Sequence, residues 1–87
     1  MARGLIGITA KGEALLERGN QAFLRENKPF PRGLNLDRWN TLKTLQKFGP
    51  MTVFDLRDRT ARFTTTGRDK AGVAIRSFRR SGVIADK

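Results

Sequence analysis

Residues 66–84 read TGRDKAGVAIRSFRRSGVI, and this stretch predicts a helix that ends at a glycine and continues directly into a strand. Four apolar residues recur at the spacing of a helix face that packs against a core: Ala71, Ala74, Ile75 and Phe78. We expect the helix to begin at Thr66 or Gly67, because Thr66 and Asp69 have the spacing of a capping box. Gly82 stands where glycine commonly follows a helix.

The opposite side of this helix is polar and mostly cationic. Successive residues of a helix are turned by about 100°, so the outward face carries Asp69, Lys70, Val73, Arg76, Ser77 and Arg80. Arg68 stands at the start of the helix and Arg79 near its end. Residues 57–80 hold eight basic and two acidic residues, a net charge of +6 out of +10 for the chain. A positive field of this strength favours a polyanionic partner such as nucleic acid.

Two more helices are expected upstream. The first begins at Asn35 or Asp37, ends at Gly49-Pro50, and has an apolar stripe of Leu36, Trp39, Leu42, Leu45 and Phe48. The second is short, covers residues 53–59, and opens at Thr52, which stands three positions before Asp55 as in a capping box. Its apolar contacts come from Val53, Phe54 and Leu56.

The N-terminal third predicts one further helix and a connector. The helix runs from Ala10 to about Glu26 with Thr9 as its cap, and Gly12 and Gly19 fall on one side, where they permit close contact with a neighbouring element. Residues 27–35 contain two prolines and form the connector, with Phe30 as an apolar contact to the core. We expect one domain over residues 1–87, with a strand, helix and connector in 1–35 and a helical core in 36–87.

Several classes of function are excluded by composition. The chain has no cysteine and no histidine, so disulfides and zinc-finger sites are excluded, and we expect neither a metal nor a cofactor. The eight carboxylates form no paired motif and no glycine-rich phosphate loop is present, so we do not expect an enzyme. The longest apolar stretch near the N-terminus, residues 5–8, is too short for a membrane span, so we expect no membrane partner and a cytoplasmic location.

From Leu36 to Ile84 the ordered features resemble the winged helix-turn-helix family of DNA-binding domains. The matching pieces are an apolar helix that closes in residues 48–52, the short helix after it, and the basic helix that closes in residues 78–84. The resemblance implies that the last helix enters the major groove of double-stranded DNA. The DNA-binding residues would then be Arg68, Lys70, Val73, Arg76, Ser77, Arg79 and Arg80. Arg76 is the candidate for guanine, and Val73 for a thymine methyl group.

A second resemblance lies at the other end of the chain. Residues 5–16, LIGITAKGEALL, look like the segment that follows the wing in many bacterial regulators of this family, but here the segment comes first. The resemblance implies that Leu5 to Ile8 pair in antiparallel fashion with a strand at Val83 to Ala85. The same pairing between two molecules would give a swapped homodimer instead of a monomer.

The expected architecture is mainly α with a small β element: a winged helix-turn-helix with an extra N-terminal helix and a two-stranded antiparallel sheet. The expected function is sequence-specific or semi-specific binding of double-stranded DNA by a small transcriptional regulator or phage-type accessory factor, nucleoid-associated when bound. Two alternatives stay open: a protein-binding inhibitor or adaptor on the same scaffold, and a basic ribosomal or RNA-binding protein.

Overall fold

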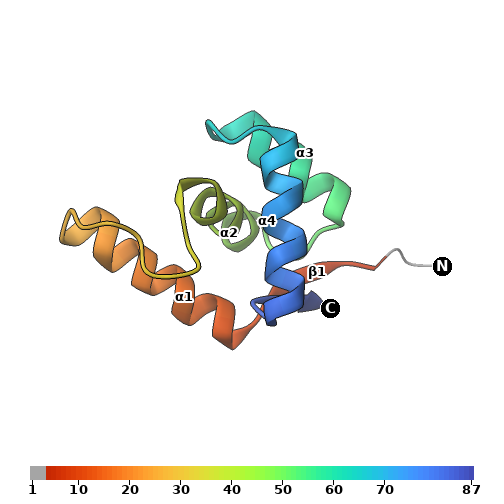
Figure 1. Ribbon diagram of the computed structural model, residues 1–87. Helices are drawn as coiled ribbons and strands as arrows, with labels where there is room; N and C mark the ends of the chain where they lie inside the picture. The colour runs from red at the N-terminus through yellow and green to blue at the C-terminus, as the bar shows by residue number, and fades with distance from the viewer. Residues whose placement is uncertain (1–3) are drawn as a thin grey trace.

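The computed structural model describes residues 4–87. The helices pack against one another, and a small two-stranded sheet lies at one side of the molecule (Figure 1). In chain order the elements are β1 (Ile6–Ile8), α1 (Ala10–Asn20), the π-helix η1 (Gln21–Arg25), α2 (Leu36–Phe48), α3 (Val53–Phe63), α4 (Arg68–Ser81) and β2 (Ile84–Asp86). The expected mainly helical fold with a short antiparallel sheet is confirmed. None of the helices in residues 4–87 combines the length and the apolar character that crossing a membrane requires.

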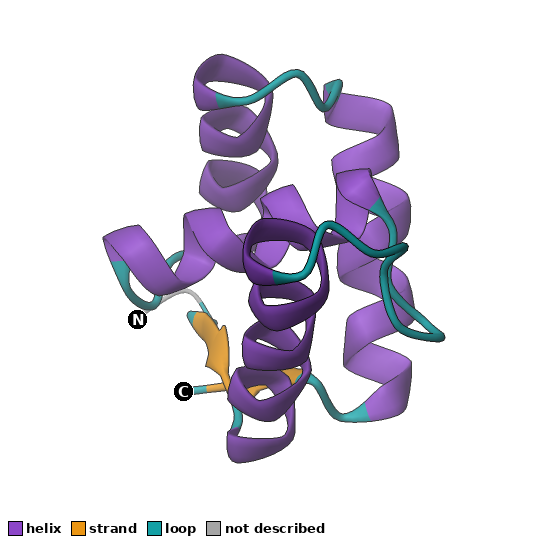
Figure 2. Cartoon of the chain, turned by 90° about the vertical axis from the view of Figure 1, so that its left-hand side faces the viewer, coloured by secondary structure: helices purple, strands orange, loops and turns teal. Residues whose placement is uncertain are grey.

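The two strands come from opposite ends of the sequence and pair in antiparallel fashion, as expected (Figure 2). Ile6 pairs with Asp86 and Ile8 with Ile84, so the second strand lies one residue later than predicted. On its other edge Ile6 exchanges two backbone hydrogen bonds with Met51, in which the N–H groups of Ile6 and Met51 donate at 2.8 and 3.1 Å. Strand β1 therefore lies between Met51 and β2.

Helix α2 lies at the centre of the molecule and contacts α1, α3, α4 and β1. The predicted core residues Trp39, Leu45, Ile75 and Phe78 are all buried. The ends of the predicted α2 stripe were wrong, because Leu36 is 45% and Phe48 38% exposed. A spacing of three residues lags behind the 3.6-residue turn, so both ends of a five-member stripe rotate about 120° away from its middle.

Helix α1 starts as predicted and ends differently. The Thr9 hydroxyl oxygen accepts a hydrogen bond from the N–H of Gly12 at 3.1 Å and caps the helix. A side chain at Gly12 would collide with the carbonyl oxygen of Val83, which confirms the expected close contact. The prediction of one continuous helix to Glu26 was wrong, since residues 21–25 form a π-turn, in which Glu26 N–H donates to Gln21 at 3.0 Å.

The π-turn at residues 21–25 accompanies an aromatic cluster at the C-terminal end of α1. The ring of Phe23 stacks on Phe30 with centroids 4.7 Å apart and lies 5.1 Å from the ring of Trp39. Phe30 packs against the core from the connector, as predicted. A strict 3.6-residue period does not anticipate this change of phase, because it arises from contacts with residues distant in the sequence.

The start of α4 differs from the predicted capping box. Gly67 is the N-cap and makes no side-chain bond to the helix, while Thr66 is 1% exposed. The Thr66 hydroxyl is bonded to α2 instead, because Asp37 and Asn40 lie beside it. At α3 the Thr52 cap is confirmed, with a 3.1 Å bond from the N–H of Asp55. The helix extends beyond residue 59 to Phe63.

One predicted contact of α3 was also wrong. Leu56 is buried and Val53 packs against the core, but Phe54 is 65% exposed. Phe54 lies two positions before Leu56, which places it on the far side of the helix from the buried face.

Candidate nucleic-acid interface

Helix α4 presents the outward face that its sequence predicts. Its apolar stripe is buried, whereas Val73 is 60% exposed and Arg76 and Arg80 are exposed beside it. Lys70 is exposed on the first turns and Ser77 is half-buried at the edge of this face. Arg68 and Arg79, predicted near the two ends of the helix, are exposed as well.

The cations of α4 differ in how far the protein neutralises them. Arg79 Nη2 lies 3.2 Å from Asp86 Oδ1, and Lys70 Nζ lies 3.9 Å from Asp37 Oδ2. The guanidinium of Arg68 lies over an aromatic ring, 5.1 Å from its centroid. Within residues 4–87, Arg76 and Arg80 have no carboxylate within ion-pair distance. These two guanidinium groups therefore have their donors available for an anion or a base edge.

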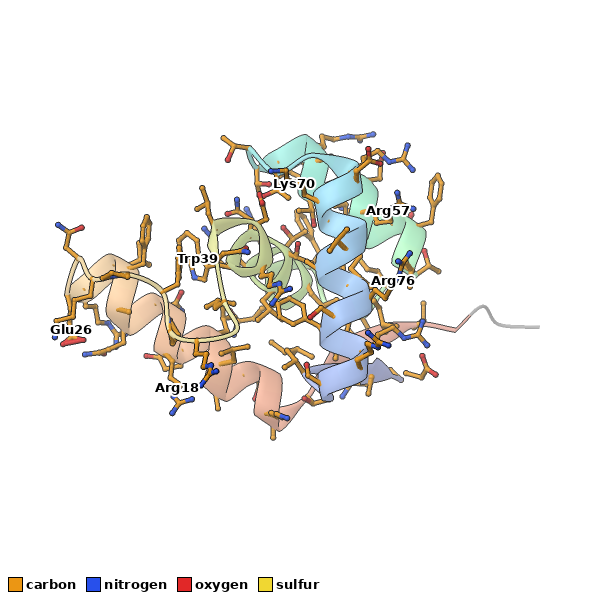
Figure 3. The ribbon with its side chains drawn as sticks, viewed as in Figure 1. Arg18, Glu26, Trp39, Arg57, Lys70 and Arg76 are labelled. Atoms are coloured by element: carbon orange, nitrogen blue, oxygen red, sulfur yellow. The ribbon has the colours of Figure 1, made fainter. Side chains whose placement is uncertain are left out.

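A hollow of about 610 Å³ lies between α3 and α4 on one side of this face. Arg57 of α3 lines it together with Val73, Arg76, Arg79 and Arg80 of α4. Asp69 of α4 also lines it, and its Oδ1 lies 3.9 Å from Arg57 Nη2, so Arg57 is partly neutralised. Arg57 lies against Gly72 and donates from Nε to the carbonyl oxygen of Arg68 at 3.4 Å, so its charge is held beside α4 (Figure 3).

On the other side of the same face a second hollow, of about 510 Å³, reaches α2. It is lined by Arg38, Val73, Arg76, Ser77, Arg80 and Ser81, and it holds no carboxylate. The exposed face of α4 is thus flanked by a guanidinium on each side, Arg57 from α3 and Arg38 from α2.

The sequence predicted the exposed face of α4 but not the two arginines that the structure places beside it. Arg57 falls in the basic run that starts the last third of the chain, which was a usable signal. Arg38 lies next to Asp37 on a helix expected to be a core element, and only the packing of α2 against α4 brings it to the site. Packing between segments that are distant in the sequence cannot be predicted from a local pattern of residues.

The exposed groups of the site are mostly hydrogen-bond donors. The site offers guanidinium, ammonium and hydroxyl donors on the exposed face of α4, with one exposed branched apolar side chain, Val73, among them. In the described part of the chain no three acidic side chains are grouped as a metal site would require. Comparison with protein-family models, characterised proteins and solved structures found no match.

Proposed function

We propose that the chain is a double-stranded DNA-binding module of the winged helix-turn-helix type, with α4 as its recognition helix. The observation that carries the proposal is the exposed cationic face of α4, on which Arg76 and Arg80 lack carboxylate partners within the described residues and which Arg38 and Arg57 flank. The role we propose is that of a small transcriptional regulator or phage-type accessory factor.

The dimensions of α4 match a DNA groove. A helix with its side chains is about 10–12 Å across, and the major groove of B-DNA is about 12 Å wide. In such a complex the guanidinium of Arg76 would donate to O6 and N7 of guanine, and Val73 would meet the methyl group of thymine. The flanking arginines would contact phosphates, which fix register and orientation.

The order of the strands supports the winged type with an altered chain order. Helices α2, α3 and α4 follow one another, Met51 lies between α2 and α3, and β2 follows α4 directly. Strand β1 lies between Met51 and β2 and leads into α1 through Thr9. In the proposed assignment β1 takes the place of the strand that usually returns from the wing.

The test is direct measurement of binding to labelled DNA duplexes of random sequence across a range of salt concentrations. A domain that neutralises several phosphates loses affinity steeply with salt, with a log-log slope of about 0.9 per phosphate. Selection of bound duplexes over several rounds then yields the preferred sequence. Failure to bind any duplex at 50 mM salt, with the protein folded, would overturn the proposal, and stronger binding to RNA of the same sequence would favour the ribosomal or RNA-binding alternative.

A second candidate function rests on exposed aromatic side chains near the ends of α2 and α3. Phe63 is 57% and Phe48 38% exposed, and their rings lie 5.4 Å apart. The guanidinium of Arg59 lies 4.7 Å from the Phe48 ring centroid. Exposed aromatics beside arginine are typical of protein-binding surfaces, so this patch favours an adaptor or inhibitor. Such binding would depend little on salt and would be lost in Phe63→Ala.

A further inference from the structure

We infer that the hollow between α1 and α4 is a seat for the phosphates of one DNA strand. Its volume is about 360 Å³, and its cationic and hydroxyl lining consists of Lys11, Arg18, Arg32, Arg38, Ser77 and Ser81. This inference rests on the proposed function and extends it to helix α1 and the connector, in which no DNA contact was expected from the sequence.

The charge of the hollow is of one sign only. Four cations reach it from three separate segments, and no carboxylate lines it. Among the acidic residues of α1 and α2, Glu17 is paired with Arg25 at 2.9 Å and Asp37 is bonded to Thr66. Glu13 of α1 is exposed and does not line the hollow. Four like charges around one small space repel one another, and a polyanion in that space offsets the repulsion.

The walls of the hollow are ordered and partly apolar. Lys11 Nζ donates to the carbonyl oxygen of Ser81 at 2.7 Å, and Arg38 Nη1 donates to that of Gly33 at 3.3 Å. These bonds fix two of the cations to the backbone. Leu15 and Phe78 supply apolar surface beneath them, and low-dielectric walls strengthen the field inside a cleft.

The hollow continues into the proposed DNA-reading face. It shares Arg38, Ser77 and Ser81 with the hollow that also contains Arg76 and Arg80. A helix that lies in the major groove has a sugar-phosphate backbone along each side. Arg57 faces one side of α4, and the hollow lies on the other, where Arg18 of α1 is found (Figure 3). The hollow between α1 and α4 would therefore bind the sugar-phosphate backbone of one DNA strand, and the backbone of the other DNA strand would lie near α3.

The experiment compares two double variants that remove the same charge. Arg18→Ala with Arg32→Ala removes two exposed cations that have no ion pair within the described residues. Lys28→Ala with Lys47→Ala lowers the net charge by the same two units at exposed positions that do not line the hollow, and of these two residues Lys28 is paired with Glu26 at 3.6 Å. Binding of the full chain to its selected duplex and to a scrambled duplex is measured from 50 to 200 mM salt, and thermal melting checks that each variant folds.

The expected result is a log-log salt slope smaller by about 1.8 in the first variant, from two phosphate contacts at about 0.9 each. Over a fourfold change in salt this corresponds to about a 12-fold difference in affinity. The ratio of affinities for the two duplexes should stay at the wild-type value, because phosphate contacts carry no sequence information. The control variant should keep a slope within about 0.5 of wild type.

Two outcomes would overturn the inference about the hollow without affecting the proposed function. If the wild type binds duplex DNA and the first variant keeps its slope, the hollow takes no phosphates, while the proposed function stands. An equal fall in slope in both double variants would show a general effect of net charge. If the folded wild type binds no duplex, the proposed function fails, and the phosphate seat fails with it.

Discussion

The Thr66 hydroxyl donates a hydrogen bond to Asp37 Oδ1 at 3.1 Å, which ties the segment before α4 to the first turn of α2. The same hydroxyl oxygen accepts from Asn40 Nδ2 at 2.9 Å, and both Thr66 and Asn40 are buried. The other oxygen of Asp37 lies 3.9 Å from Lys70 Nζ on α4. A small polar network therefore sets where the proposed recognition helix begins.

Thr66→Val should destabilise the protein by about 1–3 kcal/mol, because it leaves the buried amide of Asn40 without this partner and removes one hydrogen bond to the half-buried Asp37. Thr65→Val is the matched control, since Thr65 is exposed one position earlier, and it should stay within about 0.5 kcal/mol of wild type. Urea denaturation gives both values. Equal effects of the two substitutions would show that the network does not contribute to stability.

Arg76→Ala should weaken specific DNA binding by about 1–3 kcal/mol and relax the preference at one base position. Lys47→Ala removes the same charge from the C-terminal end of α2, away from the proposed face, and should leave that preference intact. Titration against a panel of duplexes with single base changes measures both effects. If Arg76→Ala loses affinity equally for all duplexes, Arg76 contacts phosphate and reads no base.

The parts predicted well from the sequence are those in which a local pattern determines the structure. The i, i+3, i+4, i+7 repeat from Ala71 to Phe78 fixes which side of α4 is buried, and the outward face follows from it. Gly82 has a φ of +80°, a conformation that glycine adopts readily. The end of α4 could therefore also be predicted from the local sequence. The strand pairing is a long-range contact, and it was predicted from the resemblance of residues 5–16 to the segment that follows a wing, with residues 5–8 as the best apolar β-type candidate.

The parts that were missed depend on contacts between distant segments. Thr66 has the spacing of a helix cap, but its hydroxyl forms hydrogen bonds with residues of α2 and not with the start of α4. Arg38 belongs to the site only because α2 packs beside α4. The π-turn at residues 21–25 accompanies the ring contacts of Phe23 with Phe30 and Trp39. None of these follows from periodicity or propensity within one segment.

Gly12→Ala should destabilise the protein by about 1–3 kcal/mol, although alanine favours a helix, because the added methyl group collides with the backbone of Val83. Gly72→Ala is the matched control in α4: its methyl group would meet only the side chain of Arg57, which can shift. The control should therefore range from neutral to about 1 kcal/mol more stable. Thermal melting of both variants checks this, and a stable Gly12→Ala protein would contradict the close packing of α1 on the end of α4.

Lys43 gives the protein a pH dependence at alkaline pH. Burial lowers the pKa of Lys43, and the charge of Lys47 lowers it further, although Lys43 Nζ lies 3.8 Å from the centroid of the Trp39 ring, which favours the charged form. Between this lowered pKa and the ordinary lysine value, the unfolded chain binds more protons than the folded one. The contribution of Lys43 to the free energy of unfolding therefore rises with pH in that window.

Lys47→Ala should move the pKa of Lys43 toward its ordinary value without restoring it fully, because burial is the larger cause. NMR titration of the lysine side-chain signals measures the shift. A second check is Lys43→Met, which should remove the corresponding rise in stability with pH. An unchanged pKa of Lys43 in the Lys47→Ala protein would show that the two charges do not interact.

The ends of the sheet allow the chain order itself to be tested. Lys87 N–H donates to the carbonyl oxygen of Leu5 at 2.8 Å, which continues the ladder one step past the β1–β2 pairs. In a rearranged protein, residues 1–4 are removed and a two-residue Asn-Gly turn joins Lys87 to Leu5. The turn would close this pair as a β-hairpin. The chain is then opened between Lys28 and Pro29, in the exposed connector.

This rearranged protein should fold to the same structure and fold faster than the original chain. The β1–β2 pairing, which joins opposite ends of the original sequence, becomes a local contact with a small loop-closure entropy. Fluorescence of Trp39, the single tryptophan, follows refolding by stopped flow. A matched protein with a twelve-residue Gly-Ser linker in place of Asn-Gly should fold more slowly than the hairpin version, because its loop is longer. A rearranged chain that stays unfolded would show that the ends of the sheet do not meet as the structure places them, and equal folding rates with the short turn and the long linker would show that the pairing forms after the rate-limiting step.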